Sequence, residues 1–410
     1  MRRLQFLAHG VALVALMSAL ALAQVPGTDW PQWRGPNRDG TVTTPLPASW
    51  PETLTKRWEI TVGLGHSSPV VAGDRIVLHT RQGDLEITRA VSVADGKELW
   101  RDEYDAPYTM HPAARAHGPG PKSTPAVSRG RVFTFGISGI LSALDLATGK
   151  VLWRTPAPPV PPAFGTAMSP LVDGAVVIAH VGGKNDGALT AFDAASGTPR
   201  WKWTGDGPAY SSPVIATFGG TRHVITQTQK SVVSVNAADG ALLWQIPFTT
   251  SSEQNSVTPV VAGDLVIYSG LANGVTAVRI ASTDGKWAPL QVWKNDDVSM
   301  YMNTPVIQGA TLYGLSHKNR GQFFAVDVAT GKTLWTTTGR EGDNASLISA
   351  GSVLLISTTN AELIVARTSA EKFEELKRYT IADSAVWAHP AIAKGVMLVK
   401  GVEKLTCWSW

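Results

Sequence analysis

The sequence predicts an all-β protein, an eight-bladed β-propeller in which each blade is a four-stranded antiparallel sheet. Two repeated patterns and their common period lead to this prediction. The first pattern is Asp-x-x-Thr-Gly followed by a Trp, and it is clearest from Asp145 to Trp153 and from Asp327 to Trp335. The second is a Ser-Pro or Thr-Pro step followed by apolar residues, which lies upstream of each hairpin pattern.

The first pattern describes a β-hairpin. Alternating apolar residues before the Asp are typical of a strand. The Asp, Thr and Gly then favour a tight turn, because Gly adopts positive φ freely and the Asp and Thr side chains bond nearby backbone. The residues leading to the Trp form the returning strand. Near copies of the pattern run from Ser92 to Trp100, from Asp193 to Trp201 and from Asn236 to Trp244. We interpret the repeated Trp residues as packing between neighbouring blades.

The second pattern sets the number of blades. Its copies place residues of equivalent position at Pro69, Pro125, Pro170, Pro213, Pro259, Pro305, Leu347 and Pro390. The intervals between them are 56, 45, 43, 46, 46, 42 and 43 residues. A period near 45 with four short strands per unit is typical of a β-propeller, in which units stack around an axis to bury both faces of every sheet.

Closure of the ring requires a strand from the other end of the chain. The last unit has three strand candidates, ending at Trp408, and lacks a Trp-bearing outer strand. The segment 54–62 has that character, because Trp58 lies between alternating apolar and polar residues. We therefore predict that this N-terminal strand joins the last blade and that the propeller domain spans residues 54–410.

The N-terminus predicts export. Residues 1–23 have two arginines, an apolar run and a small-residue exit, which together predict a Sec-type signal peptide; a single transmembrane anchor is the alternative. There is no lipobox cysteine at the expected cleavage site, so the predicted location is the periplasm or the exterior. No later segment is long and apolar enough to predict a transmembrane span. Residues 24–53, which contain Trp30 and Trp33 among Pro and Gly, predict an N-terminal arm packed on the propeller, with a partner-binding arm as the alternative.

Charge and cysteine content exclude several classes of protein. The formal net charge is +4, and Arg2 and Arg3 of the predicted signal peptide contribute two of these charges. No Lys/Arg block follows, which argues against a nucleic-acid partner. Cys407 is the only cysteine, so the chain has no intrachain disulfide, no Cys-x-x-Cys site and no covalent c-type haem.

The first interval is long because it contains an insertion at 104–121. Pro and Gly argue against regular secondary structure through most of this segment. His111 and His117 are candidates for acid–base or ligand-binding roles, since loops that extend a rigid scaffold often carry function. No Cys or carboxylate cluster accompanies them at metal-ligand spacing, so no metal site is predicted, and a plain surface loop is the favoured interpretation.

A candidate ligand site follows from propeller geometry. Residues that enter the innermost strand of each blade line one mouth of the central channel. Three residues before each Pro position these are His66, Lys122, Ala167, Tyr210, Ser256, Met302, Asn344 and Trp387. Neighbouring Asn255, Glu253 and Asp343 are expected to add amide or carboxylate oxygens. Aromatic walls with a few polar groups suit a ligand pocket; the alternative is that these side chains fill the funnel without a specific ligand.

The Ala-x-Asp-x-x-Thr-Gly-x-x-x-Trp unit resembles the repeat of the pyrroloquinoline quinone (PQQ) propeller family, over about residues 54–410. The segment starting Asp29-Trp-Pro-Gln-Trp-Arg looks like the opening of exported PQQ-like propeller proteins. The resemblance implies one of two functions. Quinoprotein dehydrogenases hold PQQ and calcium on the axis and oxidise alcohols or sugars, whereas the outer-membrane assembly propeller lipoprotein is a scaffold that binds proteins and no quinone.

The chain departs from both relatives. A single cysteine cannot supply the vicinal cysteines of the alcohol dehydrogenases, and the lipobox cysteine of the scaffold lipoprotein is absent. The prediction is an exported binding or interaction module, monomeric, with a protein, small-molecule or glycan partner at the propeller face and no catalysis. The alternative is an oxidoreductase that uses PQQ with calcium at the central funnel.

Overall fold

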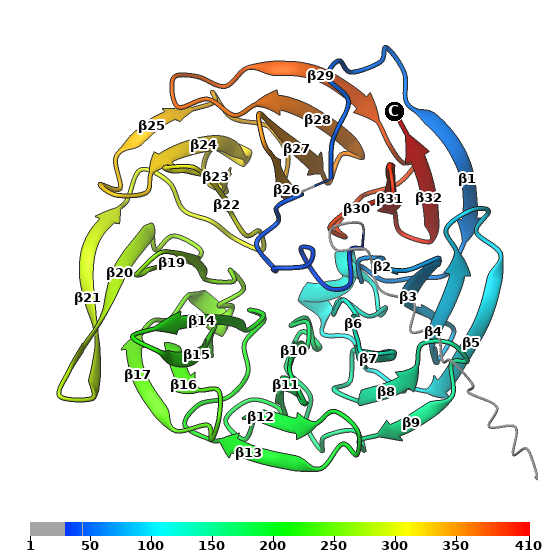
Figure 1. Ribbon diagram of the computed structural model, residues 1–410, viewed down its shortest axis with the longest axis horizontal. Helices are drawn as coiled ribbons and strands as arrows, with labels where there is room; N and C mark the ends of the chain where they lie inside the picture. Colours follow the sequence, from blue (N-terminus) through cyan, green and yellow to red (C-terminus); the bar gives the residue numbers. More distant parts are fainter. Residues whose placement is uncertain (1–28, 43) are drawn as a thin grey trace, which may run out of the picture.

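The computed structural model describes residues 29–42 and 44–410, and it confirms the eight-bladed propeller (Figure 1). The signal peptide predicted for residues 1–23 lies outside the described residues. Each blade is a four-stranded antiparallel sheet whose strands run in order from the central axis to the rim. The innermost strands are mostly three residues long, which narrows each blade toward the axis.

Blades 1 to 4 are built from β2 (Val70–Ala72), β3 (Arg75–Gln82), β4 (Leu85–Ser92) and β5 (Glu98–Asp105); β6 (Ala126–Ser128), β7 (Arg131–Phe135), β8 (Leu141–Asp145) and β9 (Val151–Arg154); β10 (Leu171–Asp173), β11 (Val176–Val181), β12 (Ala188–Asp193) and β13 (Pro199–Trp203); and β14 (Val214–Phe218), β15 (Thr221–Gln227), β16 (Ser231–Asn236) and β17 (Leu242–Pro247).

Blades 5 to 8 are built from β18 (Val260–Ala262), β19 (Leu265–Ser269), β20 (Val275–Thr283) and β21 (Lys286–Asn295); β22 (Val306–Gln308), β23 (Thr311–Ser316), β24 (Gln322–Asp327) and β25 (Thr333–Thr336); β26 (Ala345–Ala350), β27 (Val353–Thr358), β28 (Glu362–Arg367) and β29 (Glu375–Thr380); and β30 (Ala391–Ala393), β31 (Val396–Lys400), β32 (Lys404–Ser409) and β1 (Thr55–Thr61). Within the described residues, three short 3-10 helices lie in loops: η1 (Pro112–His117), η2 (Ser251–Glu253) and η3 (Lys318–Arg320).

The ring closes as predicted. Strand β1 pairs antiparallel with β32, so the outer strand of the last blade comes from the N-terminal side of the chain. Its Trp58 donates its indole N–H to the carbonyl of Val93 in blade 1, at 3.1 Å. The closing strand therefore makes the same kind of contact to the next blade that outer strands make elsewhere in the ring.

That contact explains why Trp and Gly recur together. The ring of Trp100 in blade 1 packs over Gly149 in the hairpin turn of blade 2, and its indole N–H donates to the carbonyl of Leu146 at 2.9 Å. The same Trp-over-Gly arrangement joins Trp153 to Gly197, Trp201 to Gly240, Trp293 to Gly331 and Trp58 to Gly96. These turn glycines have φ between 73° and 74°, a left-handed conformation that favours glycine. The hairpin signature is thus also the signature of the blade interface.

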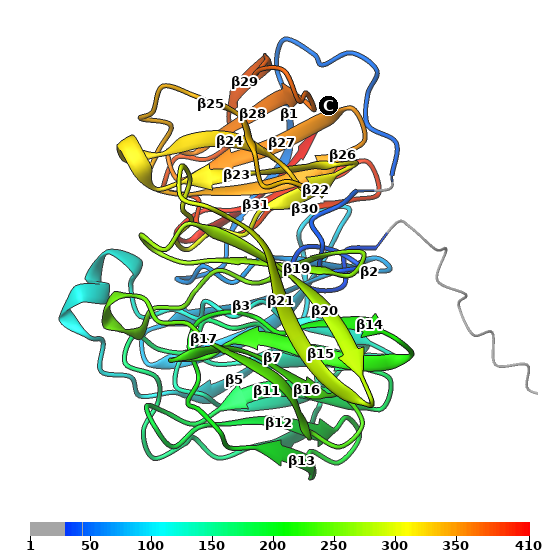
Figure 2. The same ribbon diagram turned by 90° about the vertical axis from the view of Figure 1, so that its left-hand side faces the viewer.

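The N-terminal arm crosses the centre of the ring (dark blue in Figure 1). Trp30 forms an antiparallel bridge with Val71 of β2, and Thr41 forms a parallel bridge with Ser349 of β26. The arm therefore joins blade 1 to blade 7 across the axis. Seen from the side, the arm lies at one face of the ring and η1 projects from the opposite face (Figure 2, arm at right and η1 in cyan at left).

Candidate functional site

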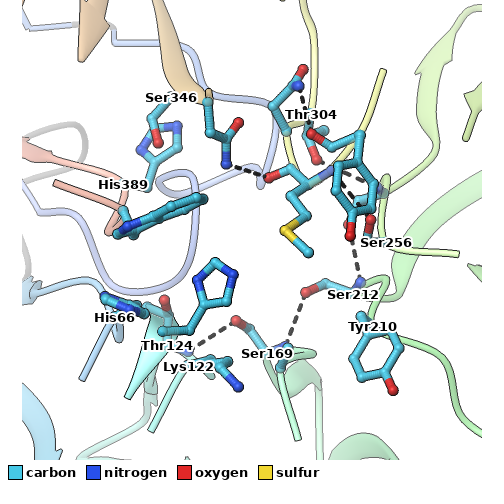
Figure 3. Close-up of a pocket in the computed structure, with 18 of the residues that line it drawn as sticks. His66, Lys122, Thr124, Ser169, Tyr210, Ser212, Ser256, Thr304, Ser346 and His389 are labelled. Atoms are coloured by element: carbon cyan, nitrogen blue, oxygen red, sulfur yellow. Dashed lines mark hydrogen bonds between the residues drawn. The ribbon is translucent and has the colours of Figure 1, made fainter. Parts of the chain in front are cut away.

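A cavity of about 390 Å³ lies on the propeller axis, between the arm and the face that carries η1. Its walls come from all eight blades, and Trp33 and Arg34 of the arm also line it. We call this cavity the axial pocket. Figure 3 shows its lining side chains converging from several blades toward a central space.

The first ring of lining residues is the one that the propeller geometry predicts. His66, Lys122, Ala167, Tyr210, Ser256, Met302, Asn344 and Trp387 all line the axial pocket. Met302 lies at the rim, where its side chain is 38% exposed. Asp343 also lines the pocket.

A second ring lies deeper and is absent from the sequence-based site. It consists of the residues immediately before the Pro positions, namely Ser68, Thr124, Ser169, Ser212, Thr258, Thr304, Ser346 and His389. Backbone N–H groups in this ring donate to the hydroxyl of the next blade, as from Thr124 to Ser169 at 3.0 Å and from Ser212 to Thr258 at 3.0 Å (Figure 3). The Ser/Thr-Pro repeat carried the signal for this ring, because one hydroxyl per blade at a fixed position must form a circle.

The insertion places His117 in the axial pocket, which corrects its interpretation as part of a plain surface loop. The His117 ring contacts Trp387 of blade 8 edge-on at 4.6 Å between centroids, and it lies 6.0 Å from His66. Residues 112–117 also form η1, although Pro and Gly argued against regular structure through most of the segment. The loop can fold back because Pro at the start of η1 suits a first helical turn.

Three sequence-based candidates lie outside the pocket lining. His111 caps η1 by accepting the N–H of Ala113 and packs on Phe164 at 4.8 Å. Asn255 is fully buried, and its amide bonds the carbonyls of Thr228 and Phe248, so it supports the loop beneath the wall. Glu253 pairs with Lys184 at 3.1 Å. Their neighbours in sequence line the pocket, but these three side chains turn away from it.

Lys122 and Tyr210 are linked through the backbone of Phe164. The Lys122 ammonium donates to the Phe164 carbonyl at 2.7 Å, and the Phe164 N–H donates to the Tyr210 hydroxyl at 3.3 Å. Burial lowers the pKa of Lys122 to about 8 and raises the pKa of Tyr210 to about 12. Burial, with the neighbouring positive charges, lowers the pKa of His66 to about 3, so this imidazole is neutral near pH 7.

Two buried arginines of the arm lie at the floor of the pocket, where Arg34 belongs to the lining and Arg38 lies outside it. Arg34 donates from Nη2 to the carbonyls of Asp39 and Pro305, at 2.9 and 2.5 Å. Arg38 donates to the carbonyls of Pro170 and Ser169, at 2.9 and 3.1 Å. Burial lowers the pKa of Arg34 to about 10 and that of Arg38 to about 9, and both remain charged near pH 7.

The pocket is poor in calcium ligands. Calcium takes six to eight oxygen ligands, usually with several carboxylates. Among the described lining residues Asp343 is the only carboxylate, and the Asn344 and Gln254 amide oxygens already accept the Ala345 N–H and the Tyr301 hydroxyl. The Asn303 amide oxygen has no hydrogen-bond partner, so one carboxylate and one amide are the side-chain oxygens of this type that remain available. No group of three His, Cys, Asp or Glu side chains suited to a metal occurs among the residues that the structure describes. The donor set therefore does not fit the calcium that accompanies PQQ in quinoprotein dehydrogenases.

Comparison with known proteins places the chain in a family. A family model described as outer membrane protein assembly factor BamB matches residues 84–337. The chain belongs to this family. BamB of Yersinia pestis is 26% identical over 248 residues, which cover 57% of this chain and 60% of that protein. The chain thus spans less than two thirds of the length of the BamB proteins that match it first.

Quinone-dependent enzymes are also similar to this BamB-family chain. Quinohemoprotein alcohol dehydrogenase ADH IIB of Pseudomonas putida is 34% identical over 123 residues, which cover 28% of this chain and 17% of the enzyme. The resemblance to PQQ-repeat propellers is thereby confirmed.

Solved structures show the same architecture. BamB of Moraxella catarrhalis has a TM-score of 0.64 at 15% identity, over 87% of this chain and 98% of the other. The quinohemoprotein alcohol dehydrogenase of Comamonas testosteroni has a TM-score of 0.67 at 14% identity, over 93% and 80%. At these identities the likeness establishes the fold alone. Within the described residues, no helix has the length and apolar character needed to cross a membrane.

Proposed function

We propose that this protein is an exported interaction module that receives part of a partner protein at the face carrying η1. The observation that carries the proposal is the asymmetry of the axis. The arm fills the channel at one face, while the axial pocket lies toward the other face and has Met302 exposed at its rim. The predicted signal peptide at residues 1–23 supports export, and relatives named as assembly factors support a role in binding proteins.

The pocket supports binding better than quinone-dependent oxidation. Its walls combine aromatic side chains with hydroxyl groups and two cations, which is the composition of a recognition site. Asp343 is the only carboxylate among the described lining residues, which favours binding over calcium-dependent quinone chemistry. Similarity in sequence to quinone-dependent alcohol dehydrogenases therefore favours the enzyme alternative, whereas the small number of calcium ligands in the pocket argues against it.

Site-specific photo-crosslinking in the native cell envelope tests the proposal. A benzophenone amino acid replaces Met302 at the pocket rim, and a matched variant replaces Leu152 of the outer strand β9, which is 42% exposed. We expect one defined partner protein to be trapped from position 302 and not from position 152. Equal trapping from both positions, trapping from position 152 alone, or no trapping from either would overturn the proposal.

A further inference from the structure

The second ring of the axial pocket holds hydrogen-bond donors without acceptors. The hydroxyl oxygens of five consecutive blades each accept a backbone N–H from the preceding blade, at 2.9 to 3.3 Å; they belong to Thr124, Ser169, Ser212, Thr258 and Thr304. Within the described part of the chain none of these five hydroxyls donates to a protein acceptor. A hydroxyl carries one proton as well as its lone pairs, so each retains a donor at the cavity wall.

Two cations line the same cavity, and Lys122 adds further donors to it. Lys122 has one hydrogen-bond partner, the Phe164 carbonyl, whereas an ammonium can make three hydrogen bonds. Arg34 is 1% exposed, and its Nε and Nη1 are buried without a hydrogen-bond partner among the described residues. Neither cation forms a direct ion pair with a described carboxylate, and Asp39 acts on Arg34 only through its electrostatic attraction. A buried charge without a direct counterion is unfavourable, and an anionic ligand would reduce that penalty.

Charge and shape narrow the class of anion. The lining carries Lys122 and Arg34 against Asp343, with His66 neutral, so its formal charge near pH 7 is +1. This balance matches a monoanion better than a dianion. Above the donors the walls are apolar or aromatic, formed by Phe164, Tyr210, Tyr301, Met302 and Trp387. A cavity of about 390 Å³ is large enough for one monoanionic group together with an apolar side chain or a small apolar body.

We propose that the axial pocket binds a carboxylate joined to an aromatic or apolar group, with the carboxylate at the hydroxyl ring and the apolar part against Trp387 and the neighbouring aromatic side chains. Hydrogen bonds to an ionised carboxylate are stronger than those between neutral groups, so five hydroxyls and two cations form a specific site. This inference rests on the proposed function, because the face of entry is the same. The carboxylate belongs either to a chain end of the partner or to a free aromatic acid, and the two sources present the same chemistry.

Calorimetry with matched probes tests the carboxylate. N-acetylphenylalanine and its carboxamide share one apolar body and differ in the charged group. We expect the acid to bind at least tenfold more tightly than the amide, and inorganic phosphate to bind more weakly than the acid. Lys122→Gln removes the charge while keeping an N–H donor at this position, and it should weaken binding of the acid about tenfold, with a clearly smaller loss for the amide. Lys150→Gln, in an exposed turn outside the pocket, is the matched control.

Two further probes separate the sources. Tighter binding of the peptide Ala-Ala-Phe than of phenylacetate would support a chain end, and equal or weaker binding would support a free acid. Equal affinity of acid and amide, tighter binding of phosphate, no binding of any acid at millimolar concentration, or unchanged affinity in a Lys122→Gln variant with wild-type melting temperature would overturn the inference. If these tests fail while crosslinking from position 302 succeeds, the carboxylate site is wrong and the interaction module stands.

Discussion

Arg34 of the arm donates from Nη2 to the carbonyl of Pro305, 271 positions further along the chain, at 2.5 Å. This bond links the N-terminal arm to the start of blade 6, while Arg38 bonds the carbonyl of Pro170 beside blade 3. The Cζ atoms of Arg34 and Arg38 both lie over the Trp33 ring, at 5.5 and 5.6 Å from its centroid. One short segment thus connects opposite sides of the ring and forms the floor of the axial pocket.

Loss of the Arg34 guanidinium should loosen the arm. Arg34→Met keeps an apolar side chain of similar length but leaves the Pro305 and Asp39 carbonyls without their donor. We expect the free energy of unfolding to fall by about 2 kcal/mol, because the buried Pro305 carbonyl without a partner costs about 1–3 kcal/mol, the part-buried bond to Asp39 adds less, and removal of a desolvated charge offsets part of this. Denaturant unfolding measures the change, and hydrogen exchange at Trp30 should accelerate.

The control for this variant is Arg200→Met, which removes an exposed ion pair with Asp193. It should change stability by less than about 1 kcal/mol. A loss in Arg200→Met as large as that in Arg34→Met would contradict the role given to the arm.

Contact between Trp100 and Gly149 makes a matched pair of glycine substitutions informative. In blade 2, Gly130 and Gly149 have nearly the same φ, 72° and 73°. A Cβ added at Gly149 would lie 2.5 Å from the Trp100 ring, whereas a Cβ added at Gly130 would have no atom within 4 Å. Gly130→Ala should therefore cost about 1 kcal/mol from backbone strain alone, and Gly149→Ala about 3 kcal/mol. Equal melting temperatures for the two variants would show that the Trp-over-Gly contact does not hold the blades together.

Asn255 is expected to matter for stability rather than directly for binding. Its side chain accepts from the N–H of Thr250 and donates to the carbonyls of Thr228 and Phe248 inside a fully buried site. Asn255→Ala leaves these groups unpaired and should destabilise the protein by about 3 kcal/mol or more. Asn273→Ala, which removes one exposed bond to Thr249, should cost less than about 1 kcal/mol. Thermal unfolding compares them, and a neutral Asn255→Ala variant would contradict the assignment.

Titration of Lys122 should change folding stability and ligand affinity in opposite directions as the pH rises. Burial lowers the pKa of Lys122 from its ordinary value of 10.5 to about 8 in the folded protein. Between these values the unfolded chain binds more protons, so this group makes the folded state more stable as the pH rises from 8 to 10.5. Binding of a carboxylate needs the charged ammonium, so affinity should fall above pH 8. His66 and His117, whose pKa values are lowered by burial, remain neutral in this range.

The affinity of N-acetylphenylalanine between pH 7 and 9 measures this effect, because Arg34, whose pKa is about 10, stays charged over this range. The fall should be present in the wild type and absent from Lys122→Gln. An affinity that stays constant to pH 9 in the wild type would contradict the role of Lys122.

Periodic features of the chain could be predicted from sequence, because each repeats at one place in every blade. Packing of the Trp residues between blades, the closing strand at Trp58 and the first ring of the pocket all follow from such repetition, whereas the position of each Trp over a turn glycine of the next blade appears only in the structure. Contacts between unrelated segments could not be predicted in this way. The return of His117 to Trp387, the inward turn of Arg34 and the outward turn of Asn255 depend on tertiary packing of irregular segments, which no period encodes.

The most direct test of the central claim is calorimetric titration of the mature protein with PQQ, with and without calcium. The binding-module account predicts that calcium leaves any affinity for this carboxylate-bearing quinone unchanged, because Asp343 is the only carboxylate among the described lining residues. One-to-one binding that calcium strengthens tenfold or more would contradict the account and identify the axial pocket as the site of a quinone-dependent oxidoreductase.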